Sequence, residues 1–448
     1  RPHEGLAGSR PGRRGQEETV VMLATLIVIF VLAYAAIALE HPLKVNKSAS
    51  ALLGAGLLWT IYALGAADAR LVSEQLNESL MGTAQIVFFL MGAMTIVEVV
   101  DAHNGFEVIT SRIKTAKLSS LMWMVGFVTF FLSAILDNLT TTIVMVSLMK
   151  KLLDKRDDRL FFAGLIVIAA NAGGAWTPIG DVTTTMLWIG GQITAMEIMK
   201  GLFLPSLVNL IVPLVVTSYV LGARPVIAPV RKADDILSDT SAFERNLMFF
   251  LGLAILVLVP VFKTVTHLPP FMGILFGLGL LWLVGDVVHR KEEDLRKQRL
   301  TLARALTRID MSSIVFFIGI LLSVAVLEHT HVLSNIAQWL NTTVGRLDVI
   351  VILIGLVSAI VDNVPLVAAS MGMYSLDTYP TDSFLWEFMA YCAGTGGSIL
   401  IIGSAAGVAA MGLEKIDFIW YMKKMSLLAL LGYGAGALVY VVQFNLLH

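Results

Sequence analysis

The chain has 448 residues and a formal net charge of −1, and only 15% of its residues are charged while 57% are hydrophobic. A soluble domain of ordinary composition carries about 25% charged residues. Apolar runs of the roughly 20 residues needed to cross a bilayer recur along the whole sequence, so we expect a multi-pass membrane protein. The sequence contains no Walker motif, which argues against an ATP-driven pump.

The chain begins with a polar segment, 1–18, that is rich in Gly and Arg. We interpret it as a processed or artificially added tail and leave it out of the fold prediction. Beyond it, ten apolar spans are predicted, near 20–39, 49–66, 84–103, 160–191, 202–221, 246–262, 271–288, 310–330, 386–412 and 425–445. Paired glycines interrupt 160–191 and 386–412, so we expect these two spans to be broken helices.

Two further apolar stretches, 119–149 and 347–376, carry polar residues at their middle. Each is too long for one span and too short for two, so we predict re-entrant hairpins that enter and leave on one side. With this arrangement, 24 of the 32 Lys and Arg residues fall on one side of the membrane, which the positive-inside rule makes cytoplasmic. Both termini are then expected outside the cytoplasm.

Three segments recur in order along the chain. SAILDN at 133–138 returns as SAIVDN at 358–363, and NAGGAWTPIGD at 171–181 aligns with GTGGSILIIGS at 394–404. IVFF occurs at both 86 and 314. The offsets of 225, 223 and 228 residues are nearly constant, so the two halves are predicted to be repeats.

The repeat predicts an all-α membrane protein with about ten transmembrane helices, two hairpins and two broken helices. We divide it into a first half, 19–222, a cytoplasmic linker, 223–245, and a second half, 246–448. The first half starts outside the cytoplasm and the second inside, so the repeats are inverted. Inverted repeats are typical of secondary transporters, whose sites lie near the middle of the membrane where the repeats meet.

Asp137 and Asp362 lie in strongly apolar stretches, far in sequence from any Lys or Arg. A charged carboxylate there costs roughly a few kcal/mol, so we expect a function, although a carboxylate that merely holds two helices together is the alternative. Asn138 and Asn363 add carbonyl oxygens, and only the first half adds the hydroxyls of 140–142. Because such oxygens suit hard cations, the first tip is the better Na⁺ site.

A third acid, Asp181, follows the glycine break of the first half. Its counterpart in the second half is Ser404, so this acidity belongs to one half only. With Asp137 and Asn138 it forms the predicted Na⁺ site. A buried carboxylate holds a proton or a cation but not both well, so the two ions would compete and exchange without ATP.

Three more acids lie near the ends of predicted spans. Glu98 and Asp101 fall late in one span, and Glu328 is the repeat counterpart of Asp101. They are candidates for a proton path. The alternative, that they are polar residues at the membrane surface, carries equal weight.

These motifs resemble the NhaD-type sodium/proton antiporters of the ion transporter superfamily over about 20–448. The resemblance implies exchange of Na⁺ or Li⁺ for H⁺ without a cofactor. It also implies a homodimer with scaffold and transport domains, in contact with lipid, in a bacterial inner (plasma) membrane; no nucleic-acid partner is expected. With Thr141 added for its hydroxyl, the expected cation- and proton-binding residues are Ser133, Asp137, Asn138, Thr141, Asn171, Asp181, Thr183, Ser358, Asp362 and Asn363.

Two other functions stay open. One is an arsenite or other anion permease, because the resemblance also implies a fold shared with arsenite permeases and dicarboxylate carriers. The carboxylate carriers have neutral hairpin tips, however, and two acidic tips would repel an anion. An intramembrane aspartyl protease would use Asp137 and Asp362 as a pair sharing one proton. The repeat accounts for that pair without any chemistry on a peptide.

Overall fold

The structure is a computed structural model that describes residues 13–113, 115, 117–221, 224–227, 241–291 and 300–447. These residues form helices joined by turns and loops, with one isolated bridge between Lys117 and Pro225. The all-α prediction is therefore confirmed. Most of the predicted tail and linker, 1–12, 223 and 228–240, lies outside the described residues, as does residue 222 at the end of the first half.

The first half contains three long helices, a hairpin, a broken helix and a final long helix. In chain order these are α1 (Arg13–Ala38), α3 (Lys47–Gly65), α4 (Ala69–Ala102), the hairpin arms α6 (Leu118–Leu136) and α7 (Asn138–Leu152), the broken pair α8 (Arg156–Gly174) and α9 (Val182–Ile189), and α10 (Ala195–Leu221). Short helices α2 (Glu40–Leu43) and α5 (Glu107–Thr110) connect them.

The second half repeats this order. It comprises α11 (Ala242–Thr266), α12 (Pro270–Val288), α15 (Met311–His329), the hairpin arms α17 (Leu347–Val357) and α18 (Asn363–Met373), the broken pair α19 (Phe384–Gly396) and α20 (Ala405–Glu414), and α22 (Ser426–Leu447). The connecting helices are η2 (His289–Lys291), α14 (Leu302–Leu306), α16 (Val332–Thr343) and α21 (Phe418–Lys424).

Within the described ranges, nine helices are long and apolar enough to cross a membrane. Eight are predicted continuous spans, and the ninth is α6, the first arm of the first hairpin. The other two predicted spans are the broken pairs α8–α9 and α19–α20, as expected.

Two helix starts differ from the prediction. Residues 13–18, assigned to the polar tail, belong to α1. Helix α4 begins at Ala69 instead of near residue 84, because Asp68 accepts hydrogen bonds from the backbone N–H groups of Arg70 and Leu71. This N-cap starts a helix whose first turns are too polar for a span.

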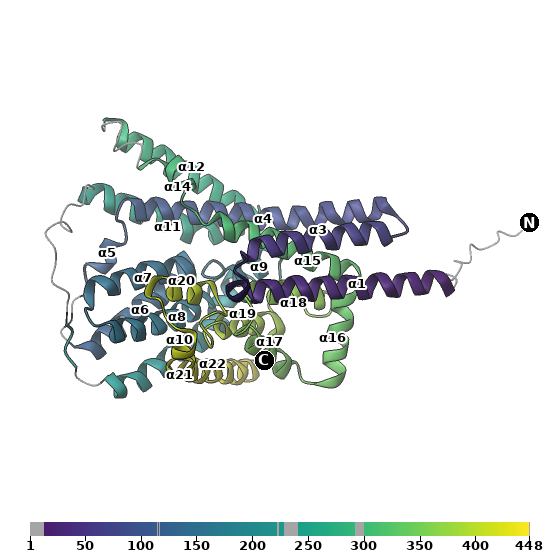
Figure 1. The fold of residues 1–448 in the computed structure, drawn as a ribbon. Coiled ribbons are helices and arrows are strands. Elements are labelled where there is room, and N and C mark those ends of the chain that lie inside the picture. The colour runs from purple at the N-terminus through teal and green to yellow at the C-terminus, as the bar shows by residue number, and fades with distance from the viewer. Residues whose placement is uncertain are drawn as a thin grey trace, which may run out of the picture.

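The helices sort into two packed groups. Helix α15 packs on α3 and α4, and α1, α11 and α12 join the same group. In the second group α6 and α7 pack on α8, α17 packs on α19, and α10 packs along α22. Figure 1 shows α3, α4, α11 and α12 along one side of the molecule and α10, α21 and α22 along the other.

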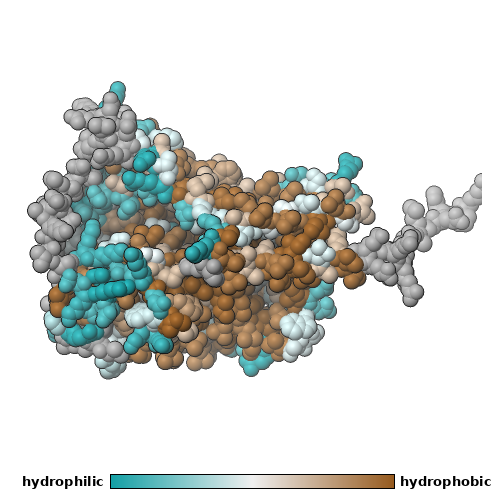
Figure 2. Space-filling model, viewed as in Figure 1, coloured by the Kyte–Doolittle hydropathy of each residue, from teal (hydrophilic) through white to brown (hydrophobic). Residues whose placement is uncertain are grey.

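The surface divides into an apolar region and a polar end. Figure 2 shows hydrophobic side chains across the middle of this face and hydrophilic residues gathered at the end near α5 and α7. Large exposed apolar side chains such as Leu53, Phe276 and Leu438 come from long helices of both halves. An apolar surface of this extent is what a bilayer requires, so the chain is a multi-pass membrane protein.

Glycines let each broken helix cross its hairpin at backbone contact. A Cβ atom on Gly173 would overlap the carbonyl of Phe130, and one on Gly396 would overlap the carbonyl of Gly355 in the second half. Added carbon atoms on Gly180 and Gly403 would likewise meet the backbone of the hairpins. The glycine motifs thus build the same crossing twice.

Candidate ion-binding site

Every break in the helices near the middle of the molecule carries a side chain that caps the following helix. In each case a side-chain oxygen accepts a hydrogen bond from a backbone N–H of the first turn: Asp137 from Thr140 (2.8 Å), Asp181 from Thr183 (2.9 Å), Asp362 from Val364 (3.3 Å) and Ser404 from Gly407 (3.2 Å). The helix N-terminus is the positive end of the helix dipole, so it offsets part of the charge of the three carboxylates.

A buried polar cluster forms where the first hairpin meets the first broken helix. The Asn138 Nδ2 group donates to Asn171 Oδ1 at 3.0 Å and to Asp181 Oδ2 at 2.6 Å. All three side chains are buried. The other oxygen of Asp181, Oδ1, accepts from both the backbone N–H and the hydroxyl of Thr183. The NH₂ group of Asn138 thus lies between two oxygens, one from each half of the broken helix.

The second half orients this cluster. Asn171 Nδ2 donates to Ser398 Oγ at 3.1 Å and to Ser404 Oγ at 2.9 Å. These hydroxyls hold the nitrogen end of the amide, so its oxygen must face Asn138. Asp181 and Ser404 are repeat counterparts with different tasks, since one supplies charge and the other fixes an amide.

Asp137 lies at the first hairpin tip in an unusual backbone conformation. Its φ of 118° and ψ of 160° belong to a region that only glycine visits freely, which costs about 1–3 kcal/mol. Both carboxylate oxygens accept from Thr140, Oδ1 from the N–H and Oδ2 from the hydroxyl. Among the described residues no hydrogen bond joins Asp137 to Asp181. The hydroxyl of buried Thr141 has no hydrogen-bond partner among the residues that the structure describes.

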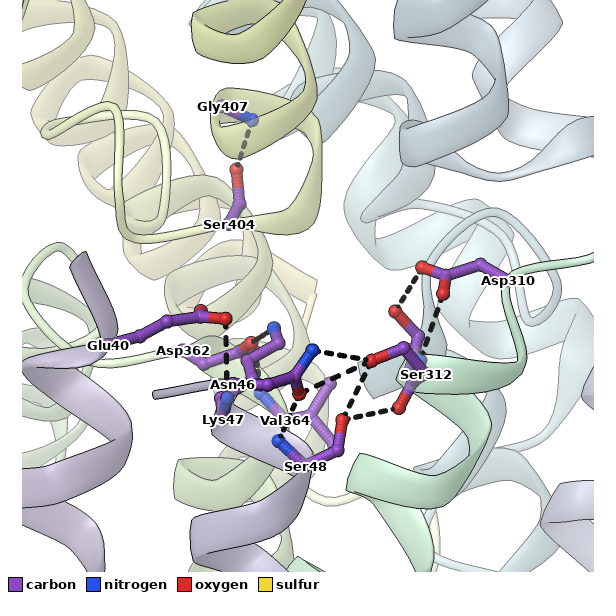
Figure 3. A network of polar contacts seen from close by, with 11 residues as sticks. Glu40, Asn46, Lys47, Ser48, Asp310, Ser312, Asp362, Val364, Ser404 and Gly407 are labelled. Atoms are coloured by element: carbon purple, nitrogen blue, oxygen red, sulfur yellow. Dashed lines mark hydrogen bonds and ion pairs between the residues drawn. The ribbon is translucent and has the colours of Figure 1, made fainter. Parts of the chain in front are cut away.

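The second hairpin tip is arranged differently. Asp362 Oδ2 lies 3.0 Å from the Nζ atom of Lys47, the first residue of α3 (Figure 3). Asp362 is far from any Lys or Arg in the sequence, but the fold brings Lys47 into contact with it. The partners are 315 residues apart, and only the packing of α3 brings them together. Asn363 is buried, and its Nδ2 has no hydrogen-bond partner among the described residues.

Ser133 and Ser358 have matching contacts in the two halves. The Ser133 hydroxyl donates to the carbonyl of Ala170 at 2.6 Å, and the Ser358 hydroxyl donates to the carbonyl of Ala393 at 2.8 Å. Each bond ties a hairpin to its broken helix. Both hydroxyl protons are therefore engaged in packing the helices.

The three acids predicted for a proton path lie apart from the cluster. Glu98 forms an ion pair with Arg308, with Oε1 at 3.3 Å from the guanidinium, while Asp101 and Glu328 are exposed. No hydrogen bond between described residues links any of them to Asp137, Asp181 or Asp362.

These features, an inverted repeat with two hairpins and carboxylates at its helix breaks, define a secondary transporter. The family model described as "Citrate transporter" matches residues 26–386. The fold is similar to the crystal structure of the Alcanivorax borkumensis YdaH transporter, with a TM-score of 0.57 over 96% of this chain and 98% of that one. Only 14% of residues are identical, so this likeness shows the fold alone.

Curated relatives narrow the family. "Sodium/proton antiporter 1" of Arabidopsis thaliana is 52% identical over 424 residues, which are 94% of this chain and 72% of that protein. "Na(+)/H(+) antiporter NhaD" of Alkalimonas amylolytica is 32% identical over 87% of this chain and 84% of that protein. The chain therefore belongs to the citrate transporter family, within its group of NhaD-type sodium/proton antiporters.

Proposed function

We propose that this protein exchanges Na⁺ or Li⁺ for H⁺ by competition at the cluster of Asn138, Asn171 and Asp181. The observation that carries the proposal is that the NH₂ group of Asn138 donates hydrogen bonds to both Asn171 Oδ1 and Asp181 Oδ2. Two oxygens that converge on one donor are also placed to converge on one cation. The antiporter names of relatives at 32–52% identity support the same pair of ions.

Cation binding requires one local change in this arrangement. If the side-chain amide of Asn138 rotates by about 180°, its oxygen takes the place of its NH₂ group and faces the cation together with the oxygens of Asn171 and Asp181. The Thr141 hydroxyl and the Asp137 carboxylate are further ligands that we propose. A proton leaves Asp181 when the cation arrives and returns when the cation leaves, so the two ions cross in opposite directions.

We assign different roles to the remaining candidates. Ser133 and Ser358 position the hairpins, and Thr183 holds Asp181. Glu98, Asp101 and Glu328 remain proposals for proton entry near the membrane surfaces, and exposure favours the last two. The division at 223–245 also remains a proposal.

The alternative functions find no support at the site. An aspartyl protease needs two carboxyl groups that share a proton. Asp137 is instead bonded to Thr140, and Asp362 is paired with Lys47. An anion permease would have to place its substrate against the Asp181 carboxylate. We therefore propose a transporter that is not an enzyme and needs no cofactor.

The membrane in which the protein lies is proposed in broader terms than the sequence alone suggested. Similar proteins come from a plant as well as from bacteria, so we propose a membrane that carries a Na⁺ or proton gradient and do not restrict it to a bacterial inner membrane. The exposed apolar side chains would contact lipid. A homodimer stays a proposal that follows from the resemblance.

The proposed exchange is tested by reconstituting the protein into liposomes that contain a pH-sensitive dye. Added Na⁺ or Li⁺ should dissipate an imposed pH gradient, and K⁺ should not. Arsenite transport without any response to Na⁺ would reverse the choice in favour of the permease.

A further inference from the structure

The repeat gives both hairpin tips the same Asp-Asn pair but not the same surroundings. In the first tip, Thr140 supplies an N–H and a hydroxyl to the carboxylate of Asp137. Its repeat counterpart is Pro365, which has neither group. At the second tip, the ammonium group of Lys47 instead lies 3.0 Å from Asp362. The charge of the second carboxylate is thus balanced by a cation that belongs to the protein.

Lys47 is held in place from several sides. Its Nζ atom lies 4.4 Å from the centre of the Phe316 ring, a cation–π contact, and its backbone N–H donates to Glu40 Oε1 at 3.2 Å. The next residue, Ser48, donates its hydroxyl to the carbonyl of Ser312 on α15 at 2.7 Å. Figure 3 shows the contacts of Lys47 and Ser48 with Glu40, Asp362 and Ser312 at the start of α3.

The pair is shielded from solvent and connects the two packed groups of helices. The side chains of Lys47 and Asp362 are 23% and 16% exposed. Helix α3 belongs to the group around α15. Asp362 precedes α18, which packs on α15 of this group and on α9 and α19 of the other. An exposed ion pair contributes little, but removing one partner of a shielded pair leaves an uncompensated charge.

We propose that Lys47 is a tethered cation that fills, at Asp362, the place that a second Na⁺ would take by the symmetry of the repeat. Asp362 then compensates charge and positions the second hairpin, and it does not carry a transported ion. This inference rests on the proposed Na⁺/H⁺ exchange and adds that one Na⁺ binds per chain, at the first tip.

The proposal makes the effects of two substitutions depend on each other. Asp362→Asn leaves an unpaired ammonium group at the second tip, and its positive charge would oppose the binding of Na⁺. Lys47→Met leaves an unpaired carboxylate that is free to take a second Na⁺. Making both changes removes both charges and leaves the second tip neutral, as it is in the wild type. Exchange should therefore fall roughly tenfold or more in Asp362→Asn and return to within about threefold of wild type in the double variant.

The number of bound Na⁺ ions supplies a second readout that a merely structural role would not change. Isothermal titration should give one Na⁺ per chain in the wild type and in Lys47→Arg, which keeps the charge, and two per chain in Lys47→Met. Lys44→Met is the matched control, because Lys44 lies exposed in the same connection and should have no effect. If Lys47→Met does not fold, the double variant with its neutral tip still decides the question.

The experiment compares these variants in proteoliposomes with the wild type. A double variant as inactive as Asp362→Asn would overturn the inference, because Asp362 would then be needed for its own carboxylate. A Lys47→Met variant that has a wild-type rate and still binds one Na⁺ per chain would overturn it as well. Wild-type protein without any Na⁺ response would instead overturn the proposed function, and the inference with it.

Discussion

The two hairpin tips start from the same Asp-Asn pair and reach different chemistry. Asp137 adopts a strained backbone conformation with φ of 118° and is bonded to its own helix through Thr140. Asp362 has an ordinary φ of −47° and is paired with Lys47 from a distant helix. A duplicated motif thus keeps its fold, while residues outside it give the two aspartates different partners.

The largest effect is expected for Asp181→Asn. Asp181 is the only charged member of the cluster of Asn138, Asn171 and Asp181, and it is the group proposed to exchange the proton. Without it, Asp137 is the one charged ligand that remains and the proton-exchanging group is lost. Na⁺-driven dissipation of the pH gradient should fall to the level of empty liposomes. Substantial remaining exchange would show that the cation binds elsewhere than at this cluster.

Asp137→Asn and Asp362→Asn should each lower the rate of exchange roughly tenfold or more, but for different reasons. The first removes a proposed ligand, and the second leaves Lys47 unpaired. Adding Lys47→Met should therefore rescue Asp362→Asn and should not rescue Asp137→Asn. The measurement is the rate of Na⁺/H⁺ exchange in the four variants. Equal behaviour of the two aspartates in this test would remove the distinction between the tips.

A smaller difference is expected between the two asparagines. Asn138→Ala removes the amide that faces Asn171 and Asp181, so the apparent affinity for Na⁺ should fall about tenfold. Asn363→Ala removes an amide whose Nδ2 has no hydrogen-bond partner among the described residues, so affinity should change little. Na⁺ titration of the exchange rate checks both. The reverse order would place the cation at the second tip.

The smallest effects should be equal in the two halves. Ser133→Ala and Ser358→Ala each remove one hydrogen bond between a hairpin and its broken helix, which costs about 0.5–1.5 kcal/mol of stability. Thermal unfolding in detergent should show a similar decrease for both, with Na⁺ affinity retained. A selective loss of affinity in Ser133→Ala would show that this hydroxyl is a ligand.

The sequence is sufficient to predict the architecture because membrane spans, hairpin lengths and glycine breaks are local patterns. It also identifies the buried acids, since a carboxylate in an apolar stretch is conspicuous. The N-cap pattern is a further local signal for the starts of α7, α9 and α18, because an Asp precedes the first turn of each.

The contacts that distinguish the halves have no local signal. Lys47 and Asp362 are separated by 315 residues, and the serines that orient Asn171 lie 227 and 233 residues away. These partners depend on how α3 and α19–α20 pack, which no repeat or spacing in the chain specifies. The start of α4 at Ala69 was not predicted because hydropathy locates the apolar span and not the polar first turns of its helix.

The number of Na⁺ ions bound per chain tests the account most directly. Isothermal titration of the purified protein with NaCl would measure it, with Asp181→Asn as the variant that should not bind. One Na⁺ per wild-type chain is the predicted result. Two Na⁺ per chain would contradict the account, because the second would have to replace Lys47 at Asp362.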